Sequence, residues 1–320
     1  MRRISRRDFV VGASTVALSA AARPAAAADV VRIGYIADFN GASLAAIATD
    51  QNLWTERSLQ PDLKVFTNGP IQIQAFGSGS LDFGYVGPGA LWLPASGRAK
   101  IIAINNLGQA DRVIAQAGVR TLADLKGKRV GVPEGTSGDM LLRLALRKQG
   151  MSLSDVELIR MDPSTVVAAF ASQQIDAAGI WYPLVGVIKE RVPDLVELAK
   201  NADFFPQIAF PTAFVARNDV ADDLSLKVIA VFKKANAFRA ANFETTIAIT
   251  SKFIGISTDK LATEVANSKF LTTPELEASA ADGTAAGWLL TLNAMFKNFG
   301  RLPEPLDPKV YFRADLYKAG

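Results

Sequence analysis

Short β-rich runs alternate with helical patterns in the first third of the chain. The runs expected to form strands are 30–36, 64–67, 81–86 and 100–105. Helix-favouring stretches lie between them, at 42–52, at 70–77 and from 90 onward. Alternation of this kind predicts an α/β fold built on a mainly parallel sheet.

A second cycle begins near residue 121. Its expected strands are 128–132, 156–161, 175–180, 195–198 and 213–216, and its expected helices are 121–126, 139–149 and 164–172. From 224 to 299 the pattern predicts helices, and 302–320 is expected to be a proline-containing tail. A chain of 320 residues is long for one hydrophobic core, so two lobes are expected.

The two cycles share a spaced motif, which reads FGSGSLD at 76–82 and FASQQID at 170–176. Each copy ends in an aspartate, for which we expect a structural role at a helix-to-strand turn. Two dipeptides, Gly87-Pro88 and Trp181-Tyr182, follow the copies at the same distance. Because ligands of open α/β sheets bind outside the carboxyl ends of strands, both dipeptides are expected to face one cleft.

The net charge of +4 is confined to the N-terminus. Residues 1–28 hold five arginines and one acid, and the rest of the chain carries equal numbers of basic and acidic residues. The body of the protein therefore has no electrostatic basis for binding nucleic acid.

The same 28 residues have the order of an export signal. A twin-arginine pattern, Ser5-Arg6-Arg7-Asp8-Phe9-Val10, precedes a short apolar stretch and a run of small residues. We expect a twin-arginine signal peptide over 1–28, cleaved near Ala28, with an uncleaved N-terminal anchor as the alternative. The mature protein is then periplasmic and not inserted in the membrane.

The chain contains no histidine and no cysteine. This excludes Ser-His-Asp and Cys-His catalysis within the chain and the usual ligands of zinc, haem and iron–sulfur sites. We expect no catalytic residue, no metal and no cofactor. An exported enzyme on the same fold, with Ser137 or Thr136 as nucleophile, is the less favoured alternative.

Three segments join a strand end to a helix start, at 39–43, 87–90 and 134–138. Their small residues expose backbone N–H groups at helix N-termini, which suits an anionic group. Ordinary helix capping is the alternative for each segment. Trp181, Tyr182 and Phe39 are expected to form an apolar wall of the cleft, with core packing as the alternative for Trp181.

Four stretches resemble the substrate-binding proteins of ABC importers for sulfonates, taurine, nitrate and thiamine-pyrimidine precursors. They read IGYIADFNGASLAAIATDQNLW, GSLDFGYVGPGAL, TLADLKGKRVGVPEGTSGDMLLRLAL and QIDAAGIWYPLVGVIKE. The resemblance implies a type II periplasmic binding fold, in which two lobes, each with a mixed sheet flanked by helices, enclose a ligand cleft. Lobe 1 would comprise 29–112 and 218–320, and lobe 2 would comprise 113–217.

By position, the resemblance implies ten ligand-binding residues. They are Phe39, Asn40, Gly69, Pro70, Gly87, Pro88, Thr136, Ser137, Trp181 and Tyr182. Three acids near these loops, Asp38, Glu134 and Asp139, depart from a simple anion site. They would receive an amine, as a taurine-like zwitterion requires, or would discourage an anion.

The implied function is capture of a small organic anion or zwitterion, sulfonate-like or taurine-like, by hinge closure. The implied partners are an ABC permease and its ATPase subunit, and the protein is expected to be a monomer. The alternatives are nitrate, an aromatic acid or a pyrimidine precursor as ligand, and a sensor subunit that presents its ligand to a receptor.

Overall fold

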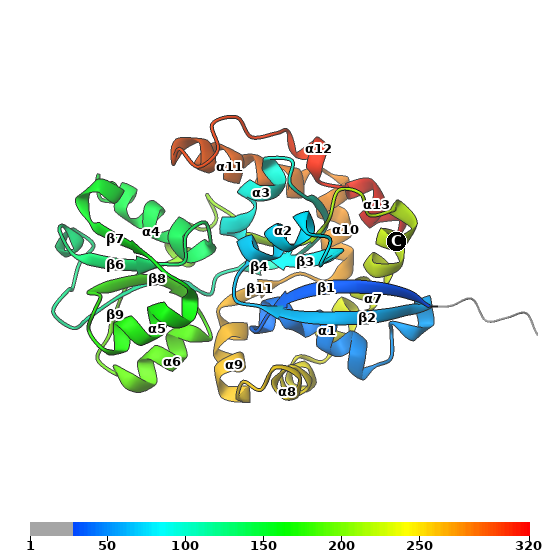
Figure 1. Ribbon diagram of the computed structural model, residues 1–320, viewed down its shortest axis with the longest axis horizontal. Helices are drawn as coiled ribbons and strands as arrows, with labels where there is room; N and C mark the ends of the chain where they lie inside the picture. The colour runs from blue at the N-terminus through cyan, green and yellow to red at the C-terminus, as the bar shows by residue number, and fades with distance from the viewer. Residues whose placement is uncertain (1–27) are drawn as a thin grey trace, which may run out of the picture.

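The computed structural model describes residues 28–320, so the twin-arginine pattern and the rest of 1–27 lie outside the described residues. Figure 1 shows two lobes side by side, each with its own sheet flanked by helices. Across the described chain, no helix combines the length and the apolar character needed to cross a bilayer.

The larger lobe holds a six-stranded sheet in the order β11-β4-β10-β3-β1-β2. Its strands are β1 (Asp29–Ile36), β2 (Leu59–Phe66), β3 (Phe83–Val86), β4 (Lys100–Gly108), β10 (Pro211–Ala216) and β11 (Ser268–Phe270). Its helices are α1 (Phe39–Asp50), α2 (Gly69–Gly77), α3 (Trp92–Ala95), α7 (Asp222–Ala241), α8 (Phe243–Ile254), α9 (Thr258–Ala266), α10 (Thr273–Ala281), α11 (Thr284–Asn298), α12 (Pro308–Tyr311) and α13 (Ala314–Ala319).

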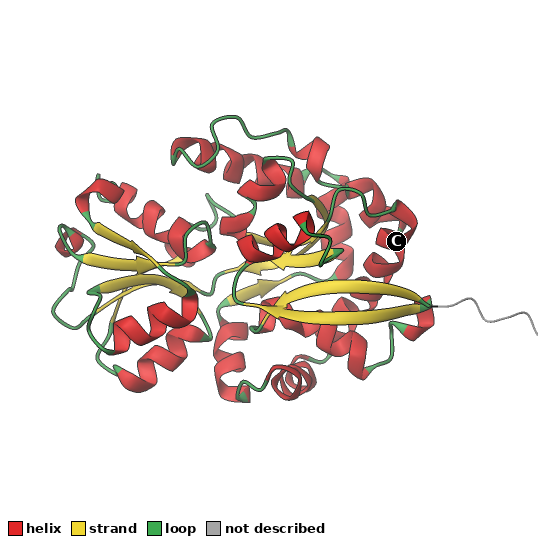
Figure 2. Cartoon of the chain, in the orientation of Figure 1, coloured by secondary structure: helices red, strands yellow, loops and turns green. Residues whose placement is uncertain are grey.

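The smaller lobe holds a five-stranded sheet in the order β7-β6-β8-β5-β9. Its strands are β5 (Asp111–Ala115), β6 (Arg129–Val132), β7 (Glu157–Arg160), β8 (Ala177–Trp181) and β9 (Val196–Lys200). Three helices, α4 (Ser137–Lys148), α5 (Pro163–Ala171) and α6 (Leu184–Arg191), flank this sheet (Figure 2).

Both sheets are mixed, as the fold class predicts. In the larger sheet β1 runs parallel to β2 and β3, whereas β10 runs antiparallel to β3 and β4. In the smaller sheet β6 is parallel to β7 and β8, and β5 is antiparallel to β8 and β9. The antiparallel strands β5 and β10 directly follow the two points where the chain passes between the lobes.

These passages differ from the expected lobe boundaries. Asp111 and Arg112 begin β5 in the smaller sheet, although 29–112 is expected in lobe 1. Residues 211–216 form β10 in the larger sheet, although 113–217 is expected in lobe 2. The reason is that β10 finds its partners among strands more than 100 residues away, which a local pattern does not reveal.

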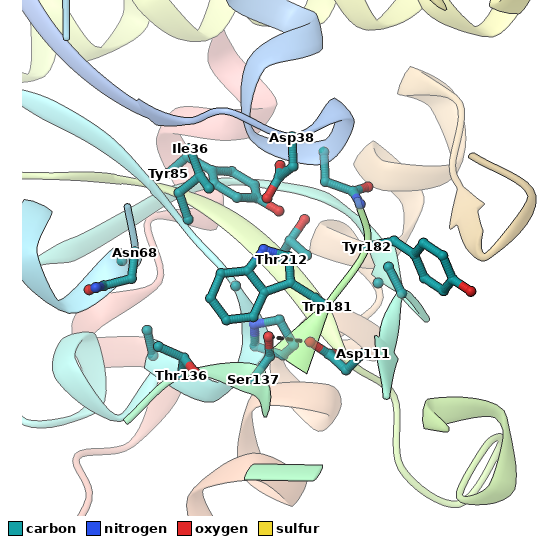
Figure 3. Close-up of a pocket in the computed structure, with 17 residues that line it drawn as sticks. Ile36, Asp38, Asn68, Tyr85, Asp111, Thr136, Ser137, Trp181, Tyr182 and Thr212 are labelled. Carbon is teal, nitrogen blue, oxygen red and sulfur yellow. Dashed lines mark hydrogen bonds between the residues drawn. The ribbon is translucent and has the colours of Figure 1, made fainter. Parts of the chain in front are cut away.

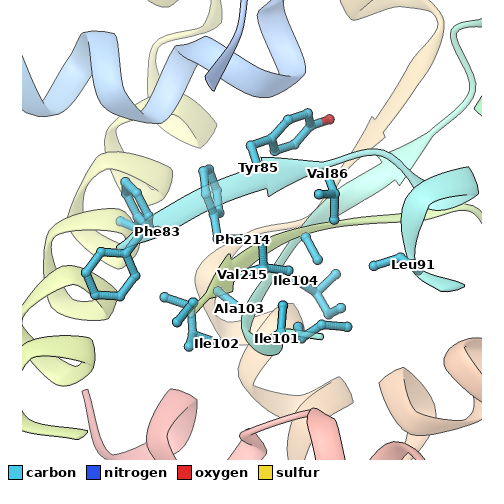
Figure 4. Close-up of a cluster of buried hydrophobic side chains, with 14 of the residues drawn as sticks. Phe83, Tyr85, Val86, Leu91, Ile101, Ile102, Ala103, Ile104, Phe214 and Val215 are labelled. Carbon is cyan, nitrogen blue, oxygen red and sulfur yellow. The ribbon is translucent and has the colours of Figure 1, made fainter. Parts of the chain in front are cut away.

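One buried apolar cluster fills the larger lobe, and two smaller clusters cover the two faces of the smaller sheet. In the larger lobe β3, β4 and β10 contribute side chains such as Phe83, Ile101 and Phe214 to one core (Figure 4). This packing fixes the strand ends that face the smaller lobe. The expected tail at 302–320 is partly helical, because α12 and α13 pack on this core through Tyr311 and Tyr317.

The repeated aspartates anchor strands, in keeping with the structural role predicted for them. Asp82 accepts a hydrogen bond from the Arg32 backbone N–H at 3.0 Å, and Asp176 accepts one from Arg129 at 2.9 Å. A local contact within the helix-to-strand turn was expected. Instead, each donor lies on a neighbouring strand, β1 or β6. Each aspartate also forms an ion pair with the side chain of the same arginine.

Candidate functional site

A pocket lies between the two lobes, at the strand ends that face each other (Figure 3). The larger lobe contributes Ile36, Asp38, Asn40, Asn68, Gly69, Tyr85, Gly87, Pro88, Ala90, Gly108 and Thr212, and the smaller lobe and its connection contribute Ala110, Asp111, Thr136, Ser137, Trp181 and Tyr182. The cavity volume is about 40 Å³, room for a few water-sized groups. The lobes therefore lie close together and leave space for a small solute.

Eight of the ten predicted residues line this pocket. They are Asn40, Gly69, Gly87, Pro88, Thr136, Ser137, Trp181 and Tyr182. The predicted repeat brings its two dipeptides to the same pocket, one from each lobe. That these residues contact a ligand remains a prediction.

Phe39 and Pro70 are not among the residues that line the pocket. The Phe39 ring is fully buried in the larger lobe, edge-on to Phe270 at 5.4 Å between ring centroids, so it belongs to the core. Pro70 occupies the first turn of α2 and lines a separate depression beside Trp92. The loops chosen by the resemblance reach the pocket, but Phe39 and Pro70 lie on the sides of their loops that face away from it.

Helix α1 begins at the pocket, yet its N-terminal amides are already bound. The Phe39 and Asn40 N–H groups donate to Glu264 of α9 at 2.8 and 2.9 Å. The Gly41 N–H donates to Asp38 Oδ1 at 2.6 Å. These carboxylates satisfy the donors that were expected to hold an anion, so ordinary capping accounts for this segment.

The Asn40 side chain is held in the same network. It donates to Glu264 Oε1 at 2.5 Å and accepts from Asn106 Nδ2 at 2.5 Å. Burial raises the pKa of Glu264 well above its ordinary value, and the nearby charge of Asp38 adds to this rise. The bonds from α1 oppose the rise. This wall of the pocket is therefore built around a buried carboxyl group.

Asp38 lines the pocket from the larger lobe and is 5 % exposed. Figure 3 shows its carboxyl group directed toward the Tyr85 hydroxyl and the indole of Trp181. The pKa of Asp38 is raised to about 7, mainly by burial and also by the charge of Asp111, against the lowering effect of bonds from Gly41 and the Trp181 side chain. One carboxylate oxygen caps α1, which leaves the other for the pocket.

Asp111 lines the opposite wall at the start of β5 and is 4 % exposed. Ser137 donates its hydroxyl hydrogen to Asp111 Oδ1, and Asn201 Nδ2 donates to Oδ2 at 3.0 Å. Burial raises the pKa of Asp111 to about 6, although these two bonds and the neighbouring Arg112 lower it. Asp111 is not among the residues predicted to bind a ligand, because its place in the cleft depends on where the chain crosses between the lobes.

The hydroxyl groups predicted to bind an anion have protein partners. Thr136 donates to the Pro133 carbonyl oxygen at 2.6 Å, and Ser137 donates to Asp111. Of the other two flagged acids, Glu134 pairs with Arg160 and Arg301, and Asp139 pairs with Arg143 and Arg301. Neither of them lines the pocket.

The lining of the pocket is acidic. Within residues 28–320 it includes two carboxylates and no lysine or arginine. The guanidinium of Arg112, beside Asp111 in sequence, is bound to Glu197 at 2.9 Å and to Asn267. The pocket therefore offers hydrogen-bond acceptors with negative charge, between the aromatic side chains of Tyr85, Trp181 and Tyr182.

Direct contacts join the lobes around the pocket. Arg301 pairs with Asp139 at 3.0 Å, and Lys260 pairs with Glu190 at 2.9 Å. A Cβ atom added at Gly89 would lie 2.1 Å from the Thr136 carbonyl oxygen. The lobes thus meet backbone to backbone on one edge of the pocket and through ion pairs elsewhere.

Comparison with known proteins places this architecture in a family. The family model described as NMT1/THI5 like matches residues 42–244. A Brucella abortus protein named as a candidate binding protein is 57% identical over 320 residues, which cover 99% of this chain and 100% of that protein. A candidate aliphatic sulfonates-binding protein of Escherichia coli is 26% identical over 272 residues, 79% of each chain.

Among solved structures, the periplasmic aliphatic sulphonate binding protein of Escherichia coli superposes with a TM-score of 0.70 at 22% identity. The superposition covers 90% of this chain and 99% of that one. At this identity the likeness concerns the fold. The chain therefore belongs to the NMT1/THI5-like family and has the fold of the periplasmic binding proteins.

Proposed function

We propose that this protein is the solute-binding component of an ABC importer, which captures a small organic solute between its lobes. The observation that carries the proposal is the pocket itself, which is lined by strand ends of both sheets and closed by contacts between the lobes. A solute bound there touches both lobes at once, so it favours the closed form by the difference in its affinity for the two forms.

The relatives support this reading and suggest ligands to test. The names of three relatives describe them as sulfonate- or taurine-binding proteins, and two of these names call the relative itself periplasmic. A taurine-like zwitterion or a sulfonate is therefore the first ligand class to test, followed by nitrate, aromatic acids and pyrimidine precursors. The proposed partners are a permease and its ATPase subunit, and the proposed location of the monomer is the periplasm, reached through the twin-arginine route.

The site supports binding rather than catalysis. Ser137, the nucleophile of the alternative hypothesis, donates its hydroxyl hydrogen to Asp111, and no lysine lines the pocket within the described residues. A serine is activated by a base that takes its proton, and a carboxylate whose pKa is about 6 is a weak base for this purpose. Conversion of a bound solute that is lost in Ser137→Ala would contradict this assignment.

The test is a thermal-shift panel followed by small-angle X-ray scattering. A ligand with micromolar Kd at millimolar concentration should add about 4 kcal/mol to the unfolding free energy. The same ligand should reduce the radius of gyration as the lobes close. Folded protein that shows neither change with any sulfonate, zwitterion, nitrate, aromatic acid or pyrimidine would contradict the proposed function. Genes next to this one for a histidine kinase, rather than a permease and an ATPase, would favour a sensor.

A further inference from the structure

The charges that line the pocket are unbalanced. Asp38 projects from the larger lobe and Asp111 from the smaller lobe, and each is at least 95% buried. The two carboxylates are close enough for the charge of Asp111 to raise the pKa of Asp38. Burial of two such groups is unfavourable unless a cation or strong hydrogen-bond donors accompany them.

Among the described residues, the pocket lining supplies hydrogen-bond donors but no cationic side chain. Asp38 accepts one backbone N–H and a bond from the Trp181 side chain, and Asp111 accepts one hydroxyl and one side-chain amide N–H. An ionised carboxylate has about four acceptor positions, so both groups keep acceptor capacity toward the cavity. The positive charge of Arg112 lowers the pKa of Asp111 from outside the pocket lining, where its guanidinium is bound to Glu197 and Asn267.

Arg239 is buried behind the wall of the pocket rather than in it. It donates to Ser43 Oγ, to the Asn105 carbonyl oxygen and to Asn236 Oδ1, and its guanidinium lies 4.7 Å from the centroid of the Phe270 ring. It forms no ion pair with a carboxylate of the described chain. It therefore does not neutralise Asp38 or Asp111.

The remaining walls suit a cationic group. Figure 3 shows the Trp181 ring and the Tyr85 hydroxyl beside the space that Asp38 and Asp111 border. The faces of aromatic rings attract ammonium and amidinium groups, most strongly where water is excluded. A protonated amine carries N–H donors and positive charge together, which is what two opposed carboxylates lack.

We propose that the ligand carries a protonated amine, or an equivalent cationic nitrogen group, that binds between Asp38 and Asp111. This proposal rests on the proposed function and narrows its solute class to zwitterions and organic cations. Simple anions such as nitrate or an alkanesulfonate without an amine are excluded as primary ligands. The proposal also assigns the two carboxylates as the residues that determine specificity.

The test uses pairs of probes that differ only in the amine. Taurine is compared with isethionate, in which a hydroxyl replaces the ammonium group, and benzylamine is compared with benzyl alcohol. Affinities are measured by calorimetry at pH 8, where Asp38 is ionised. In at least one pair, the amine should bind ten times or more tightly than its partner, and Asp38→Asn should remove most of this difference.

Asp82→Asn is the matched control. Asp82 is also buried, but it is paired with Arg32 and Arg217 outside the pocket, so this variant should keep the probe affinities within twofold. The melting temperature of the ligand-free protein also distinguishes the role of Asp38 from that of Asp82. At pH 8 Asp38→Asn should leave the melting temperature unchanged or raised, because it removes an uncompensated buried charge and keeps a cap for α1, whereas Asp82→Asn should lower it.

The outcomes separate this proposal from the proposed function. If isethionate, benzyl alcohol or nitrate binds as tightly as the amines, the amine proposal is overturned while solute capture stands. If Asp38→Asn lowers the melting temperature as much as Asp82→Asn does, Asp38 is structural and the proposal is also overturned, whether or not a probe binds. If no compound of the wider panel changes the melting temperature or the scattering, the proposed function fails instead.

Discussion

Gly89 is a position where the closed arrangement of the lobes leaves no room for a side chain. It lies in the short 3-10 helix Pro88–Ala90 of the larger lobe and faces the backbone before α4 of the smaller lobe. A Cβ atom at this position would lie 2.1 Å from the Thr136 oxygen, 2.2 Å from the Thr136 carbonyl carbon and 2.4 Å from the Ser137 nitrogen. All three are backbone atoms, so no side-chain rotation relieves the contact. Gly89→Ala should therefore hold the lobes apart.

The size of the effect follows from this geometry. Ordinary contact begins near 3.4 Å, so the Cβ and the Thr136 oxygen must separate by at least about 1.3 Å. Overpacking of this kind typically costs about 1–3 kcal/mol. Here the cost applies only to the closed form, because the neighbouring atoms belong to the other lobe. At about 1.4 kcal/mol for each factor of ten, the solute should bind roughly 5 to 150 times more weakly.

Calorimetry with the tightest compound of the panel and scattering of the saturated protein measure this effect. Gly89→Ala should lower the affinity and enlarge the radius of gyration of the bound form, with the melting temperature of the empty protein nearly unchanged. Gly77→Ala is the control, because Gly77 lies outside the pocket between the lobes and its Cβ would have no neighbouring atom within 4 Å. Equal affinities of the two variants would refute the argument, as would a large loss of melting temperature in Gly89→Ala alone.

Three further predictions concern single residues. The empty protein should lose stability as the pH rises from about 4 to 7. The cause is that folded Asp38, with its pKa raised to about 7, keeps a proton that the unfolded chain releases at lower pH. Denaturant titrations at pH 5 and pH 8 should show this loss of stability, and Asp38→Asn should reduce it. Arg301→Ala removes an ion pair with Asp139 that joins the lobes, so scattering should show a more open empty protein, and salt should have less effect on opening than in the wild type. Thr136→Ala should cost about 1 kcal/mol of unfolding free energy, since its hydroxyl donates to the Pro133 carbonyl oxygen; an unchanged denaturation midpoint would contradict this.

Much of the fold could be predicted from the sequence because its elements are marked locally. The strand-helix alternation and the repeated FGSGSLD and FASQQID motifs identify two units of similar build, and the structure has two such units. What could not be predicted is the partner of each antiparallel strand. Residues 211–216 have the same β-rich pattern whichever sheet they join, and only pairing with β3 and β4, across more than 100 residues, decides between the lobes.

The candidate site likewise has features that the local sequence predicts and features that depend on distant parts of the chain. The loops that reach the pocket are those that follow strands, and chain order identifies them. The charge of the pocket is a tertiary property, because Asp111 follows a crossing between lobes and Glu264 reaches α1 from α9, 225 residues away in sequence. Small residues at a helix start predicted an anion site, but a carboxylate from a distant helix occupies the amides of α1. An exposed helix N-terminus cannot be recognised until its neighbours are known.

The position of the two carboxylates relates the charge of the ligand to lobe closure. Asp38 and Asp111 belong to different lobes, so closing the empty pocket brings two acids together as they are buried. Burial is the main cause of the raised pKa of Asp38, and repulsion by the charge of Asp111 adds to it. Opening the lobes returns both groups to water and relieves this repulsion. A cation placed between the two carboxylates is attracted to both of them, which replaces the net repulsion by a net attraction. The cation therefore stabilises the closed form, which the repulsion between the carboxylates disfavours in the empty protein. On the amine proposal, the ligand thus supplies the interaction that holds the lobes together, and a neutral analogue of the same size would fill the pocket without closing it.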